Sequence, residues 1–111
     1  MEDLLLMTTA LPADYKIVKQ FGLVTGVTCR TRGVGGKFVA GFEAMAGGEV
    51  TSFTSEMEKA RFQAIERMKE KASALGANAV VGIDIETSEV YVGIVLVSAT
   101  GTALVIEQKG K

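Results

Sequence analysis

The spacing of apolar residues between positions 55 and 75 predicts one long amphipathic helix. Apolar side chains recur there every three or four residues, as one buried face of a helix requires. The residues of this stripe are Met57, Ala60, Ala64, Met68, Ala72 and Leu75, with Phe62 and Ile65 widening it. Charged residues at 66–71 fill the opposite face, and their mixed pairing indicates solvated surface rather than a site.

Both ends of this helix have sequence signals. Ser55 is a good N-cap, and Glu58 three residues later completes the pattern of a capping box. We therefore expect the helix to begin at Ser55. Gly76 follows the last residue of the stripe, and glycine is favoured there because the residue after a helix often takes a positive φ.

Residues 15–30 alternate in a way that predicts a strand. Six side chains fall on one face at a period of two: Tyr15, Ile17, Phe21, Leu23, Val27 and Cys29. Gly22 and Gly26 fall on the other face. Glycine inside a strand predicts a bulge or the close approach of another backbone.

Two further strands are expected at 79–87 and 91–106. In the first, Val81, Ile83 and Ile85 point one way, and Val80, Gly82, Asp84 and Glu86 point the other way. The last strand is apolar on both faces in its first half, with Val92, Ile94 and Leu96 on one side and Val95 and Val97 on the other. A strand that is apolar on both faces is covered on both faces. One helix covers only one of them, so the second cover is a neighbouring subunit or a short apolar helical segment at 38–46.

Together these elements predict a single domain spanning residues 1–111. Residues 1–13 are expected to form a short strand or arm, and residues 33–37 a glycine-rich loop. The order strand, short helix, long helix, strand, strand predicts an α+β fold of two layers, a β-α-β-β subunit with an antiparallel sheet and one long helix.

Composition narrows the function classes. The chain has no histidine, which excludes Ser-His and Cys-His catalysis and zinc bound by histidine. The net charge is −1, so we expect neither nucleic acid nor an anionic membrane surface as a partner. The single cysteine fits a cytoplasmic setting. The uncharged run from Val90 to Ile106 falls short of the roughly 20 residues of a membrane helix and is rich in β-branched residues.

Asp84 and Glu86 are the first candidates for ligand binding. Residues two apart on a strand project from the same face, so the two carboxylates could hold a hard cation or act as an acid and base pair. The structural alternative is that they mark where the strand emerges into solvent.

Cys29 is the only thiol available to a soft metal ion. A ring of subunits could bring several copies of it to a shared axis, whereas the structural alternative is a small side chain packed in the core. Arg30, Arg32 and Lys37 flank the glycines at 33–36, and this loop could hold an anion or could be a solvated turn. It fails the P-loop pattern, because Phe38 follows the lysine.

Several motifs resemble the YbjQ-like family. They are Val24-Thr25-Gly26, Gly47-Gly48-Glu49, the run from Ala74 to Glu86, and the segment from Val97 to Ala103. The resemblance implies a dodecin-like subunit that assembles into a ring, a pentamer, in an uncharacterised family labelled putative heavy-metal-binding. This chain departs from the family pattern at 53–55, where a tyrosine is usual, and in the loop at 30–36.

These observations favour a ring-forming, non-catalytic homo-oligomer that binds a small ligand or a metal ion. The alternative from another class is an enzyme that uses Asp84 and Glu86 on a small anionic substrate held by the 33–37 loop. A third alternative is a module for assembly or partner docking alone.

Overall fold

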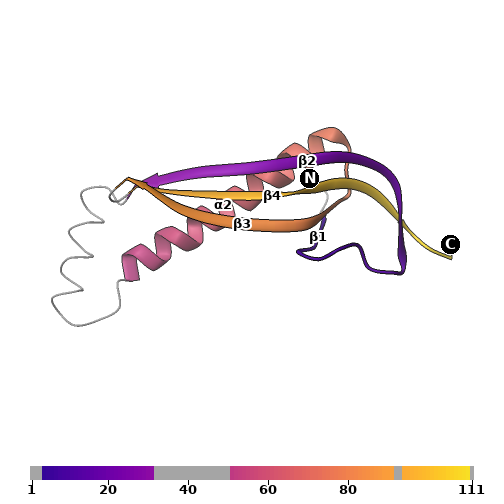
Figure 1. Ribbon diagram of the computed structural model, residues 1–111, viewed down its shortest axis with the longest axis horizontal. Coiled ribbons are helices and arrows are strands. Elements are labelled where there is room, and N and C mark those ends of the chain that lie inside the picture. Colours follow the sequence, from indigo (N-terminus) through magenta and orange to yellow (C-terminus); the bar gives the residue numbers. More distant parts are fainter. Residues whose placement is uncertain (1–3, 32–50, 92–93, 111) are drawn as a thin grey trace.

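The protein folds into one helix packed on a long, narrow sheet (Figure 1). The computed structural model describes residues 4–31, 51–91 and 94–110. Their elements are β1 (Leu5–Leu6), β2 (Tyr15–Thr31), α2 (Thr51–Leu75), β3 (Ala79–Tyr91) and β4 (Ile94–Gln108). The predicted α+β class, with two layers and one long helix, is confirmed, and the predicted segment at 38–46 lies outside the described residues.

The sheet has the strand order β1-β3-β4-β2. β2 and β3 each run antiparallel to the central strand β4, as predicted. β1 lies parallel to β3, with Leu5 opposite Ala79 and Leu6 opposite Val80, so the sheet is mixed rather than wholly antiparallel. The N-terminal arm lies at this edge, and the chain then turns before it enters β2 at the other edge of the sheet.

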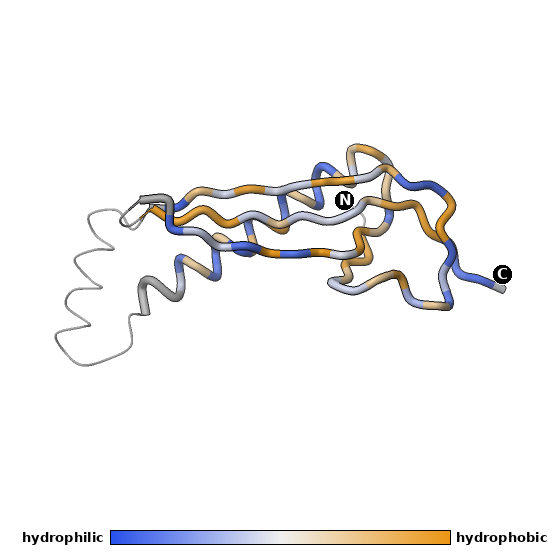
Figure 2. Tube along the Cα trace, in the orientation of Figure 1, coloured by the Kyte–Doolittle hydropathy of each residue, from blue (hydrophilic) through white to orange (hydrophobic). Residues whose placement is uncertain are grey.

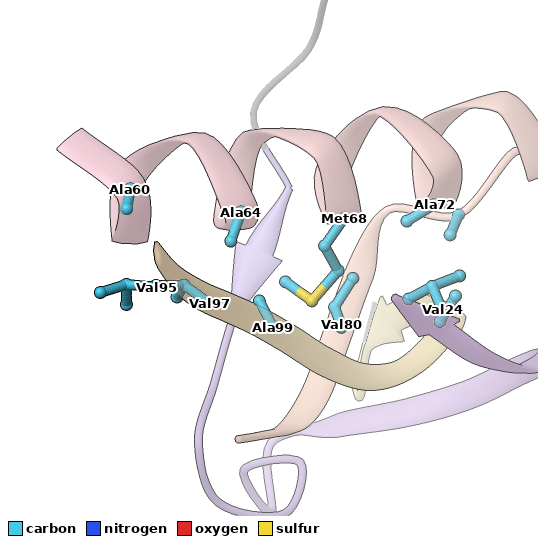
Figure 3. Close-up of a cluster of buried hydrophobic side chains, with 11 residues drawn as sticks. Val24, Ala60, Ala64, Met68, Ala72, Val80, Val95, Val97 and Ala99 are labelled. Carbon is cyan, nitrogen blue, oxygen red and sulfur yellow. The ribbon is translucent and has the colours of Figure 1, made fainter. Parts of the chain in front are cut away.

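The core lies between α2 and the face of the sheet formed by β2 and β4 (Figure 3). The predicted stripe is confirmed at its centre, where four helix residues are fully buried: Ala60, Ala64, Met68 and Ala72. Phe62 and Leu75 are wrongly placed in that prediction, with 66% and 48% of their surface exposed. Phe62 lies on the outer side of the helix, and Leu75 lies at its last residue.

Gly26 allows the helix to approach β2 closely. A Cβ atom added there would overlap the carbonyl oxygen of Ala64 and the backbone nitrogen of Met68. The predicted close approach of another backbone is therefore confirmed. The alanines of the helix stripe serve the same contact, because small side chains leave the two backbones near each other.

The two ends of α2 differ in how well the sequence predicts them. The helix already includes Thr51, so Ser55 lies inside it and the predicted capping box is wrong. A Ser-x-x-Glu pattern is local and also fits a helix interior when helical residues precede it. At the other end Gly76 has a φ of 94°, and the N–H groups of Gly76 and Ala77 donate to Ser73 and Ala72. This is a Schellman motif, and it confirms the predicted stop.

Two irregularities in β2 remove Phe21 from the predicted apolar face, whereas its other five residues remain together. The register with β4 shifts between Ile17 and Lys19 and again between Gln20 and Gly22. As a result Phe21 packs against the helix-side core, whereas Leu23 is 75% exposed on the other side of the sheet. Gly22 has a φ of 99° at the second shift, which confirms the bulge predicted from its position.

A third irregularity reorders the faces of β3. The register with β4 shifts between Val81 and Asp84, and Gly82 has a φ of 62°. Val80 and Ile83 therefore pack toward α2, whereas Val81 packs on the opposite side. The predicted common face of Val81, Ile83 and Ile85 is wrong, because an inserted residue reverses the alternation beyond it.

The N-terminal arm covers one end of the sheet face that α2 does not reach. There Leu5, Leu11 and Tyr15 pack against a second cluster formed by Ala79, Leu104 and Ile106. The arm is also tied to the β3 bulge, because the Gly82 N–H donates to the Thr9 carbonyl and the Ile83 N–H donates to the Met7 carbonyl. The arm predicted at 1–13 is thus part of the fold.

The molecule is unusually long for its size. Its principal extents are 59 × 22 × 22 Å and its radius of gyration is 17.8 Å, against about 13 Å for a compact chain of this length. Apolar and polar positions mix along the strands (Figure 2). No helix among the described residues is long and apolar enough to span a membrane.

Candidate functional site

Within residues 4–31, 51–91 and 94–110, no element covers much of the sheet face opposite α2, and we call this face the open face. It is defined by the side chains that alternate with the buried, helix-side positions of β4. Register places neighbouring side chains in rows across three strands. The open face comprises Leu23, Thr25, Val27 and Cys29 of β2, Leu96, Ser98, Thr100 and Thr102 of β4, and Asp84, Glu86 and Ser88 of β3.

Asp84 and Glu86 both project from the open face, as the sequence predicted for residues two apart. The bulge at Gly82 determines which face this is. Asp84 lies opposite Thr100 and Glu86 opposite Ser98. Both residues are exposed, and no ion pair within the described part of the chain includes either. Carboxylates beside hydroxyl groups offer the oxygen donors that hard cations and hydroxylated ligands use.

Cys29 lies on the same face, two strands away. It is exposed, so the alternative that it packs as a small core side chain is wrong. Cys29 keeps the predicted face with Leu23 and Val27, but α2 covers the opposite face of β2. Cys29 lies opposite Leu96 of β4, and the width of β4 separates it from β3 by roughly 10 Å.

These donors do not fit a heavy-metal centre within one subunit. Soft metal ions prefer several thiolates, and the chain has only Cys29. Within residues 4–31, 51–91 and 94–110 no three cysteine or carboxylate side chains come close enough to hold one ion. A centre of several thiolates would need Cys29 from more than one copy of the chain.

Arg30 lies on the opposite side of the sheet from Asp84 and Glu86. Its Nη1 atom is 3.1 Å from Glu56 Oε2 and its Nη2 atom donates to Gln63 Oε1 at 3.4 Å, both on α2. Gln63 Oε1 also accepts from the Thr28 hydroxyl at 2.5 Å. The sheet therefore separates Arg30 from the two carboxylates, so one site does not contain all three. Arg32 and Lys37, the other predicted anion ligands, lie outside the described residues.

A groove of about 650 Å³ runs beside α2 at the level of Arg30. Arg67 crosses it and donates from Nη1 to the Val27 carbonyl at 2.6 Å. The groove is lined by Arg30, Glu58, Lys59, Phe62, Gln63, Glu66, Arg67 and Glu70. The sequence analysis treated the charged helix face as solvated surface. The spacing of residues along the helix does not predict the groove, because the groove depends on how α2 lies across the end of β2.

Comparison with known proteins identifies the family. Residues 4–107 match the YbjQ family, which is described as putative heavy-metal-binding. The chain belongs to this family. The match confirms the resemblance predicted from the Gly, Asn, Asp and Glu positions of the run at 74–86.

Family members of similar length are found in archaea. A UPF0145 protein of Sulfurisphaera tokodaii is 42% identical over 104 residues, covering 94% of this chain and 91% of that protein. A UPF0145 protein of Thermoplasma acidophilum is 37% identical, covering 96% and 90%. A crystal structure from Pediococcus pentosaceus, described as a DUF74 protein of unknown function, superposes with a TM-score of 0.64 at 18% identity and covers 94% of this chain and 98% of that one. At this identity the likeness concerns the fold alone.

Proposed function

We propose that this protein is a non-catalytic homo-oligomer that binds a small ligand or ion on the open face, at a site completed by a neighbouring subunit. The observation that carries the proposal is the position of Asp84 and Glu86. Both lie exposed on a face that α2 leaves bare, next to the hydroxyl groups of Thr100 and Ser98. The family implies a ring, with five subunits by resemblance.

Self-association is supported by the shape and by exposed apolar residues on β2. The radius of gyration of 17.8 Å exceeds that of a compact chain of this length by about a third. Ile17, Val18 and Leu23 are 52%, 53% and 75% exposed. Large apolar side chains grouped along one strand are typical of a surface that another chain covers.

The ligand class follows from the donor atoms. Carboxylates and hydroxyl groups favour a hard cation, which binds six to eight oxygen atoms in the case of Ca²⁺. Two carboxylates supply too few, so a neighbouring subunit or the ligand itself must supply the others. A heavy metal ion would instead use Cys29 from several copies, and a cytoplasmic setting would keep that thiol reduced.

A metal titration tests the site directly. We expect Ca²⁺, Mn²⁺ or Zn²⁺, added separately, to raise the melting temperature of the purified protein, because an ion that binds only the folded state stabilises it. The Asp84→Asn/Glu86→Gln variant should lose the shift, and Glu107→Gln, an exposed carboxylate elsewhere, should retain it.

The Cys29→Ser variant separates the two metal classes. Loss of binding in this variant alone would assign the ion to the thiol instead of the carboxylates. An equal shift in all variants would show that neither group forms the site, and the open face would lose its proposed role.

A further inference from the structure

β2 and β3 leave backbone edges that no other described element pairs. β2 is the last strand in the order β1-β3-β4-β2, so its outer edge is free from Tyr15 to Thr31 within residues 4–31, 51–91 and 94–110. β3 is bonded by the N-terminal arm only as far as Ile83. Its outer edge from Asp84 onward has no partner strand in the same part of the chain. Free edges of this length are templates for pairing with another chain.

The two edges carry opposite charge. β2 contains Lys16, Lys19 and Arg30 and no acidic residue. β3 contains Asp84, Glu86 and Glu89 and no basic residue. Two copies of the β3 edge would bring like charges together, which is unfavourable, whereas β2 carries only basic charges, of which Arg30 lies level with the free part of β3. The charges thus select head-to-tail contact over symmetric contact.

The free part of β3 is level with the regular end of β2. Register through β4 places Asp84 in the row of Thr100 and Thr25, and Glu89 in the row of Val95 and Arg30. Rotation of one copy about an axis parallel to the strands would therefore bring its β2 edge beside the β3 edge of the other copy, with no shift along the strand direction. The rotation also keeps the strand direction, so the two strands would pair in parallel.

Side chains on the helix side of the sheet fit the same contact. Glu89 lies opposite the buried Val95, which places it on the same side as Arg30. Ile85, opposite Ala99, is on this side too and remains 36% exposed. The groove beside α2 opens next to Arg30 and can take such a side chain.

We propose that the free edge of β3 docks along the outer edge of β2 of a second copy of this chain. Ile85 then enters the groove beside α2, and Glu89 pairs with Arg30 of the partner subunit. The Val27 carbonyl already accepts from Arg67, but a carbonyl has a second lone pair and can accept from a neighbouring strand as well.

This contact rests on the proposed homo-oligomer and deepens it, because it names the residues that complete the site. Adjacent strands lie about 4.8 Å apart. Asp84 and Glu86 would therefore lie beside Thr25 and Val27 of the partner subunit on one continuous open face. Cys29 of the partner subunit would follow one row further, next to Ser88.

Charge reversal tests the pairing. Light scattering over a dilution series should show that Glu89→Arg weakens assembly at least about 10-fold, since like charges then face each other across the contact. The Glu89→Arg/Arg30→Glu double variant, made in a Glu56→Gln background because Arg30 already pairs with Glu56, should restore assembly, since the contact between copies again joins opposite charges. Lys71→Glu, an exposed charge on α2 outside the groove, is the matched control.

A second pair of variants tests the groove. Ile85→Lys should weaken assembly, and Leu75→Lys, an exposed apolar residue at the end of α2, should not. Circular dichroism and melting temperature of each variant report whether the subunit still folds.

The outcomes separate this contact from the proposed function. A wild-type protein that is monomeric would overturn both. If the wild-type protein is an oligomer and the Glu89→Arg and Ile85→Lys variants assemble normally, only the proposed contact is overturned. The charges on the strand edges would then serve only to prevent aggregation. Failure of the double variant to recover would overturn the pairing of Glu89 with Arg30.

Discussion

At the scale of single residues, glycines and one asparagine determine how the layers fit. Gly26 has no room for a side chain beneath α2, and Gly76 ends that helix with a φ of 94°. Asn78 acts as an additional strand residue, because its side-chain amide donates to the Ile106 carbonyl at 3.0 Å and its Oδ1 accepts from the Ile106 N–H at 2.8 Å. The sequence indicated that Gly76 ends the helix, but the bond from Asn78 to β4 depends on the distant strand.

Replacement of Gly26 should be the more damaging of two glycine substitutions in β2. We expect Gly26→Ala to lower the free energy of unfolding by about 3 kcal/mol, because the helix must move away from the strand. Gly22→Ala should lower the free energy of unfolding by about 1–2 kcal/mol. The added Cβ would contact no neighbouring atom, so only the positive φ of this position is unfavourable for alanine. Urea denaturation measures both, and equal losses would contradict the close packing of α2 on Gly26.

At the scale of elements, bulges decide which side chains face which layer. Regular alternation predicted the existence and approximate bounds of β2, β3 and β4. It failed at the register shifts near Val18, Phe21 and Gly82, since each extra residue reverses the faces beyond it. The two bulges of β2 together restore its alternation, so Leu23, Val27 and Cys29 keep the predicted common face, and that face lies opposite α2.

The N-terminal arm should contribute to stability as an element of the sheet. The Leu5→Ala/Leu11→Ala variant should lose about 2–4 kcal/mol, because both side chains cover Leu104 and Ile106. Thr8→Ala, an exposed position of the arm, should change stability by less than about 0.5 kcal/mol. Thermal unfolding compares the two variants. Equal melting temperatures would show that the second cluster does not depend on the arm.

At the scale of the whole molecule, the narrow two-layer shape leaves more surface than one helix can cover. α2 shields one face of β4, and the arm shields only one end of the other face. The apolar first half of β4, with Leu96 on the open side, led to the prediction that a neighbouring subunit or the segment at 38–46 covers this side. The neighbouring subunit belongs to the proposal about assembly, and the shape of the subunit supports that proposal.

Assembly of the wild-type protein should be measurable directly. We expect light scattering to give a mass several times the 11.7 kDa of the chain, because burying Leu23 and its neighbours lowers the free energy of the oligomer relative to the separated subunits. A mass of one chain at micromolar concentration would contradict the proposed oligomer.

The sequence by itself determined the long helix, its stop at Gly76, the three long strands and the family. These features are local, because they depend on spacing, capping and turn residues that lie near one another in the chain. The tertiary structure decided the start of the helix, the faces of β2 and β3, the exposure of Cys29 and the separation of Arg30 from Asp84 and Glu86. These depend on register between strands distant in sequence and on where α2 crosses the sheet, so no local pattern contains them.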